Sequence, residues 1–145
     1  MHLQLSEEQQ FIKATARRFS TDELFPIAAQ LDIGQGRALL LANLQKLGDL
    51  GFMGLNISAE YGGTEAGSVA FSVALTELGR ACASTAVTVS VTNMVCEVIQ
   101  ACGTEQQKQN YLPKLCSGEY PAGGFCLTES VAGSDPAGMK TRAVK

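Results

Sequence analysis

The fold depends on one stretch, Val87-Thr88-Val89-Ser90-Val91-Thr92-Asn93-Met94-Val95-Cys96-Glu97-Val98-Ile99-Gln100-Ala101-Cys102, which fits two secondary structures. Its first six residues alternate apolar and polar side chains, as a half-buried strand does, and β-branched residues favour that structure. Over the whole stretch, however, apolar side chains recur at the spacing of a helix: Val87, Val91, Met94, Val95, Val98 and Cys102. The helical pattern is the longer of the two, and Gly103 offers a stop. We therefore predict a helix over residues 85–102.

The segments on either side also carry helix signals. Ser6 with Gln9, and Thr104 with Gln107, have the spacing of capping boxes, which predicts helix starts at both places. The first helix should reach about Phe25, and the last should restart near Pro113 and end at Gly118. Periodic apolar residues predict two further helices, one through Leu40, Leu44 and Leu47 and one through Phe71, Leu75, Leu78 and Cys82. The predicted fold class is mainly α, an up-and-down bundle of about five helices over residues 1–120.

The character of the chain changes near residue 120. Glycines at 123 and 124 precede a short apolar run, Phe125 to Leu127, which predicts the first strand of a β-domain over residues 121–145. Thr128 and the small-residue turn 132–135 follow this run. Small side chains let backbone N–H groups approach an anion closely, although an ordinary polar loop after a strand fits the same residues.

Composition excludes several classes of function. The formal net charge is −3, and Arg17-Arg18 is the only adjacent basic pair, which argues against nucleic-acid binding. The five cysteines are odd in number and lack C-x-x-C spacing, so we predict reduced, mostly buried thiols and no metal site. No stretch of 18 apolar residues and no secretory signal is visible, so no membrane span is expected.

Four collinear segments resemble one protein family. They are Leu127-Thr128-Glu129 with Ala132-Gly133-Ser134-Asp135, Glu60-Tyr61-Gly62-Gly63, the run from Glu77 to Ala86, and Gly103 to Lys108 with Tyr111-Leu112-Pro113. All four resemble the acyl-CoA dehydrogenases, and the match covers essentially the whole chain. The resemblance implies an N-terminal α-helical domain over residues 1–120, followed by the start of the middle β-domain over 121–145. It also implies a homodimer or homotetramer.

The family reaction is the α,β-dehydrogenation of an acyl-CoA thioester. A glutamate base takes the α-proton, a hydride leaves to N5 of FAD, and an electron-transferring flavoprotein usually accepts the electrons. By resemblance, the residues that contact the flavin ring are Phe125, Leu127 and Thr128, and those at the FAD phosphates are Gly133 and Ser134. Those that face the substrate are Ser134, Val91, Thr92 and Val95, with core packing as the alternative for Val95.

Two features depart from the family pattern. Ser130 and Val131 stand where the motif usually has Pro-Gly, and a valine does not easily adopt a positive φ. The family's glutamate base comes after the position of Lys145, so we expect no catalytic residue in this chain, and we interpret the chain as an inactive fragment. Alternatives are an acyl-CoA oxidase, a flavin monooxygenase, or a non-catalytic helical interaction module. The expected location is the cytoplasm, or the mitochondrial matrix in a eukaryote.

Overall fold

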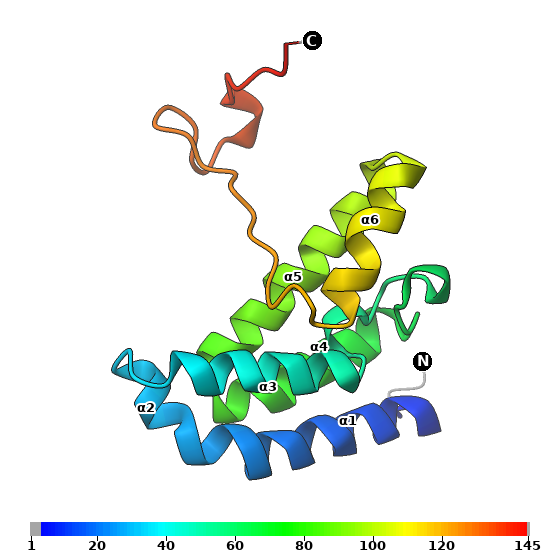
Figure 1. Ribbon diagram of the computed structural model, residues 1–145, viewed down its shortest axis with the longest axis vertical. Helices are drawn as coiled ribbons and strands as arrows, with labels where there is room; N and C mark the ends of the chain where they lie inside the picture. Colours follow the sequence, from blue (N-terminus) through cyan, green and yellow to red (C-terminus); the bar gives the residue numbers. More distant parts are fainter. Residues whose placement is uncertain (1–3, 145) are drawn as a thin grey trace.

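The computed structural model describes residues 4–144 and is mainly helical (Figure 1). Its five long helices are α1 (Glu7–Phe19), α3 (Arg37–Asp49), α4 (Gly67–Ala81), α5 (Ala83–Cys102) and α6 (Glu105–Cys116). The helical path of α1 continues through a π-helical turn, η1 (Ser20–Leu24), and a 3-10 turn, η2 (Phe25–Ile27), into the short α2 (Ala28–Asp32). Further 3-10 turns are η3 (Phe52–Gly54), η4 (Ala59–Tyr61) and η5 (Pro136–Gly138). The predicted fold class is confirmed.

Both capping boxes form as the sequence predicts. The Ser6 hydroxyl accepts from Gln9 N at 3.2 Å, and the Gln9 side chain accepts from Ser6 N at 3.0 Å. Thr104 and Gln107 make the same reciprocal pair at 3.3 and 2.8 Å. Each box satisfies two N–H groups that a helix start would otherwise leave unpaired, and so fixes where α1 and α6 begin.

The predicted restart of the last helix at Pro113 is wrong, because α6 runs through this proline without a break. A proline inside a helix removes one backbone hydrogen bond and crowds the preceding turn. In α6 the residues around it, Leu112, Leu115 and Cys116, are all buried. Their packing on the rest of the bundle offsets the local cost and keeps the helix intact.

Neighbouring helices pack in the order α1 on α4, α4 on α5 and α5 on α6. A single extended residue, Cys82, separates α4 from α5 and caps both. The larger core cluster has Leu24, Leu44, Leu47, Phe52, Met53, Leu78 and Val89 among its members. A smaller cluster joins η4, α5 and α6, and includes Ile57, Tyr61, Cys96, Leu112, Leu115 and Cys116.

Helix α5 forms as predicted, but the face that it buries is not its apolar stripe. The side chains that it buries are Thr85, Val89, Thr92, Asn93 and Cys96. Four residues of this stripe, Val87, Met94, Val98 and Cys102, are instead exposed, the first three by 60, 38 and 43%. The reason is that polar residues of the inner face find hydrogen-bond partners inside the bundle, so burial need not follow hydrophobicity.

The same helix is long and apolar enough to cross a membrane by length and composition alone. It also packs against α4, α6, α3 and η3. Asn93 shows how closely it is packed. Its amide oxygen accepts from Leu55 N at 2.8 Å, and its amide nitrogen donates to the carbonyls of Phe52 and Val89, each at 2.9 Å.

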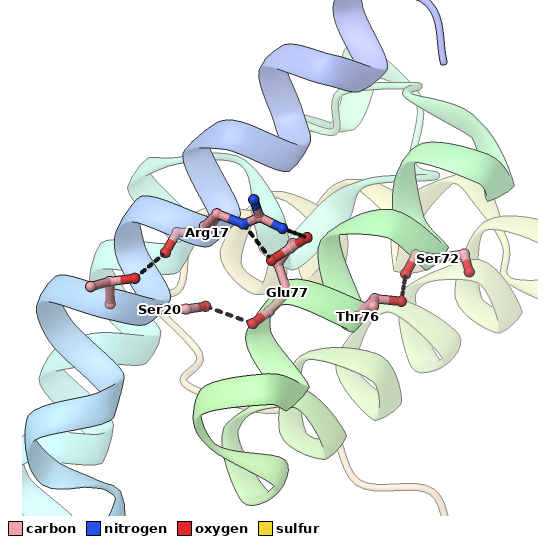
Figure 2. A network of polar contacts seen from close by, with 6 residues as sticks. Arg17, Ser20, Ser72, Thr76 and Glu77 are labelled. Carbon is pink, nitrogen blue, oxygen red and sulfur yellow. Dashed lines mark hydrogen bonds and ion pairs between the residues drawn. The ribbon is translucent and has the colours of Figure 1, made fainter. Parts of the chain in front are cut away.

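A bidentate ion pair joins α1 to α4 (Figure 2). The Arg17 guanidinium donates to both carboxylate oxygens of Glu77, at 3.0 and 2.9 Å, and the Ser20 hydroxyl donates to the Glu77 carbonyl at 2.9 Å. Glu77 is only 4% exposed. The hydrogen bonds from Arg17 lower the pKa of the Glu77 carboxyl below its usual 4.5, against the opposing effect of burial.

This pair predicts an acid-sensitive part of the stability. Because the folded-state pKa lies below the unfolded one, the stabilisation is complete above the usual value and is lost as the pH falls through the folded value. We expect Glu77→Gln to be less stable than the parent at pH 7 and to lose less stability than the parent between neutral and strongly acidic pH. Urea unfolding across that pH range measures both. A parallel loss of stability in parent and variant on acidification would contradict the assignment.

After α6 the chain leaves the bundle and runs as an extended segment away from the helices (Figure 1). The expected first strand over 125–127 has no pairing partner among residues 4–144, so no strand forms there. The β-type pairing in this part of the chain is one isolated bridge, between Glu129 and Ala132. A strand depends on hydrogen bonds to a neighbour, and the apolar run alone does not supply one.

Candidate functional site

The segment after α6 is fixed to α5 at Gly123. Its N–H donates to the Thr92 hydroxyl at 3.0 Å, and that hydroxyl donates in turn to the Thr88 carbonyl at 2.8 Å. Gly123 also lies directly against Val95, since a Cβ built on it would be 2.9 Å from the Val95 Cβ. We call residues 123–135 the motif segment. The structure therefore places the start of this segment beside the face of α5 that carries Val91 and Val95.

Beyond Gly123, the residues expected to hold a flavin are open to solvent. Phe125 and Leu127 are 45 and 40% exposed, and Thr128, Gly133 and Ser134 are exposed as well. Neither hydroxyl, of Thr128 or of Ser134, forms a hydrogen bond within the described part of the chain. A Cβ on Gly133 would have no atom within 4 Å, so its backbone can be approached closely. These groups fit a ligand that offers hydrogen-bond acceptors, phosphates included.

A tight turn separates the residues expected to contact the flavin ring from those expected at the FAD phosphates. Glu129 N donates to Ala132 O at 2.9 Å, and Ala132 N donates back to Glu129 O at 3.2 Å. The turn passes through Ser130 and Val131 without a positive φ at Val131, because Glu65 is the one non-glycine residue in the described range that has one. The departure from the family's Pro-Gly therefore does not strain the backbone here.

Glu129 organises this turn with its side chain. Its carboxylate accepts from the backbone N–H groups of Lys140 and Thr141, each at 2.8 Å. The hydrogen bonds from Thr141 and Lys140 lower the pKa of this carboxyl below its usual value. A carboxylate held ionised in this way is suited to a structural role and not to proton transfer at neutral pH.

The residues expected to face the substrate divide into two groups on α5. Val91 and Val95 are half-buried, on the side of α5 that also presents Val87, Met94 and Val98. Thr92 is fully buried and both hydrogen-bonding functions of its hydroxyl are used. The structure thus gives Thr92 no exposed atom with which to touch a ligand, while Val95 lies directly against Gly123.

Sequence reasoning did not single out Gly123 as a contact residue. Its close packing on Val95 and its bond to Thr92 depend on where the segment crosses α5, which no local pattern specifies. A usable signal was present on α5 itself. A threonine in the middle of an apolar helix needs hydrogen-bond partners when it is buried, so Thr92 signalled a polar contact inside the bundle.

The geometry defines a helical domain whose longest helix, α5, holds Gly123, and the exposed small-residue, hydroxyl-bearing motif follows further along the chain. Residues 6–119 match the family model described as the acyl-CoA dehydrogenase N-terminal domain. The chain belongs to this family, as the resemblance predicted.

Proteins similar to this chain include an acyl-CoA dehydrogenase and chains in two solved structures. The chain is 37% identical over 145 residues to the short-chain specific acyl-CoA dehydrogenase of Clostridium acetobutylicum, covering 99% of this chain and 38% of the relative. A chain in a structure described as the electron transferring flavoprotein of Acidaminococcus fermentans superposes with a TM-score of 0.86 at 31% identity, over 97% of this chain and 36% of that one. An acyl-CoA dehydrogenase complexed with FAD from Bacillus anthracis gives 0.83 at 29% identity, over 94% and 23%. The chain spans well under half the length of each.

Proposed function

We propose that this chain forms one side of the flavin and substrate site of an FAD-dependent acyl-CoA dehydrogenase. The observation that carries the proposal is the placement of the motif segment. Gly123 fixes it against α5, so that the exposed residues 125–134 begin beside the apolar face of Val91 and Val95. Family membership supplies the reaction class, and the FAD complex of the Bacillus anthracis relative supports the cofactor.

The flavin contacts fall to five residues. Phe125, Leu127 and Thr128 would border the ring, and Gly133 and Ser134 would meet the phosphates, where an open backbone and a hydroxyl suit an anion. When bound, FAD supplies the acceptor for the hydride that leaves the β-carbon of the acyl group. The part of this chain is to orient that acceptor through hydrogen bonds and to exclude water with apolar side chains.

The acyl-CoA thioester would lie along α5. Val91 and Val95 offer an apolar wall for the acyl chain, and the Ser134 hydroxyl would border the thioester. Thr92 would act on this site indirectly, through its hydrogen bond with Gly123, because its own side chain is buried. The glutamate base is proposed to lie outside these residues, so this chain contributes binding and orientation and not proton abstraction.

Further proposals concern partners and location. An electron-transferring flavoprotein is the proposed electron acceptor, supported by the description under which the Acidaminococcus fermentans neighbour was solved. We also propose a homodimer or homotetramer that contacts neither nucleic acid nor membrane. The proposed location is the cytoplasm, or the mitochondrial matrix if the source is a eukaryote.

The test compares two conservative substitutions in the FAD-loaded protein that contains this chain. Thr128→Val keeps the side-chain shape and removes the hydroxyl, so we expect a flavin reduction rate about tenfold lower, since a bond to a group that gains charge is worth roughly 1–2 kcal/mol more than a neutral one. Ser134→Ala should instead reduce the FAD retained after gel filtration, because the charge of a phosphate is unchanged during turnover. Flavin absorbance and anaerobic single-turnover reduction by butyryl-CoA measure the two effects.

The other outcomes either contradict the proposed site or favour another function. Equal effects of both substitutions on both quantities would contradict the division of roles. FAD retention and reduction that neither substitution alters would remove the proposed site. Flavin reduction by acyl-CoA followed by rapid reaction with oxygen would favour an oxidase. Flavin reduction by a nicotinamide cofactor instead of acyl-CoA would favour a monooxygenase. Absence of flavin from the parent protein would favour an interaction module.

A further inference from the structure

We infer that Thr92 and Gly123 form a latch that positions the motif segment on α5, and that Thr92 is a positioning residue of the proposed site. The inference rests on the proposed function for its consequence, but the latch itself rests on three contacts. Thr92 is 0% exposed, its hydroxyl accepts from Gly123 N at 3.0 Å, and the same hydroxyl donates to Thr88 O at 2.8 Å. The donated bond orients a lone pair of the oxygen toward Gly123.

The latch is the last hydrogen-bonded link between the motif segment and the helices. Just before it, Tyr120 N donates to Lys114 O at 2.9 Å. After it, the hydrogen bonds within the described residues are local to the segment, as between Glu129 and Ala132 and between Glu129 and Thr141. The direction in which residues 124–135 leave α5 therefore depends on how Gly123 is held.

Packing makes the position of the latch specific. A Cβ on Gly123 would approach Val95 Cβ to 2.9 Å and both Val95 methyl carbons to 3.2 Å, so only glycine brings the backbone this close. Val95 is also a wall residue of the proposed acyl site. The latch thus sets how far Thr128 and Ser134, the groups proposed to meet the flavin, lie from Val95.

A direct test measures exchange of the Gly123 amide hydrogen by NMR in residues 1–145. In Thr92→Val we expect exchange to be faster by about tenfold or more, since a hydrogen bond shifts an equilibrium by roughly that factor. Thr92→Ser restores the hydroxyl and should restore protection. Thr88→Val is the matched control, because the Thr88 hydroxyl makes the same kind of bond one turn earlier, to Ser84 O at 2.9 Å, with no contact to Gly123. Unchanged Gly123 exchange in Thr92→Val would overturn the latch.

The positioning role is tested in the FAD-loaded protein. Thr92→Val should lower the rate of flavin reduction by butyryl-CoA by about tenfold or more, with FAD content retained, and Thr92→Ser should recover the rate. A rate that Thr92→Val leaves unchanged while Gly123 exchange rises would overturn the positioning role. A parent protein without flavin would overturn the proposed function and this role with it, while the exchange measurement would still decide whether the latch exists.

Discussion

Replacement of Asn93 by leucine is expected to destabilise the helical domain by about 3–5 kcal/mol, among the largest effects of any single substitution in it. Leucine has a similar volume, so the change opens no large cavity. It removes, however, both the acceptor for Leu55 N and the donor to Phe52 O. Those two backbone groups belong to residues that are 2 and 1% exposed, so water does not replace the lost partner.

Asn43→Leu provides a matched control. Asn43 is also buried, at 4% exposure, but makes a single longer bond, to Glu23 O at 3.2 Å. We expect this variant to lose about 1 kcal/mol. Urea unfolding followed by far-UV circular dichroism measures both variants. Equal losses, or a loss at Asn93 below that at Asn43, would show that the bonds of Asn93 to Leu55 and Phe52 do not hold α5 against the turn at these residues.

The second large effect is expected at Gly63, in the connection between α3 and α4. A Cβ built on Gly63 would lie 2.0 Å from the carbonyl oxygen of Ile57, a fully buried residue whose carbonyl also accepts from Glu65 N at 3.1 Å. The backbone must move to admit even one methyl group. Gly63→Ala should therefore cost about 3 kcal/mol or more, as overpacking against a fixed main chain does.

Two other glycines separate crowding from backbone conformation. Gly62 has a φ of +85°, but its Cβ would meet nothing nearer than 3.9 Å, so Gly62→Ala should cost about 1–2 kcal/mol from the left-handed conformation alone. Gly124 has open space and no positive φ, so Gly124→Ala should change stability by less than about 0.5 kcal/mol. The ranking 63, then 62, then 124 in urea unfolding is the expected result. A Gly63→Ala variant as stable as Gly62→Ala would contradict it.

Local signals predicted the elements of this fold well. The capping boxes at Ser6 and Thr104 set helix starts, and the long helical period over 85–102 outweighed the short alternation at its beginning. Both signals depend on contacts within a few residues, which a single sequence contains. The direction of the stripe on α5 was not predictable in the same way, because Asn93 gains its buried place from Phe52 and Leu55, about forty residues away.

The sequence suggested the candidate site as a set of residues but did not specify how they are arranged. The motif identified Thr128, Gly133 and Ser134, and the structure leaves all three exposed. The hydrogen bond between Thr92 and Gly123 could not be predicted from the neighbours of Thr92 in sequence, because its partner lies 31 residues away. The strand expected at 125–127 failed for a related reason, since strand formation depends on a partner and not on the run itself.

The one-residue connection at Cys82 makes the length of this region as constrained as its composition. Ordinary loops absorb insertions, but here α5 begins one residue after α4 ends. Each residue turns a helix by about 100°. An insertion in the first turn of α5 would thus have to rotate Asn93 out of the core or pull the helix away from Cys82. Natural variants of this domain should therefore differ here by substitution and rarely by insertion or deletion.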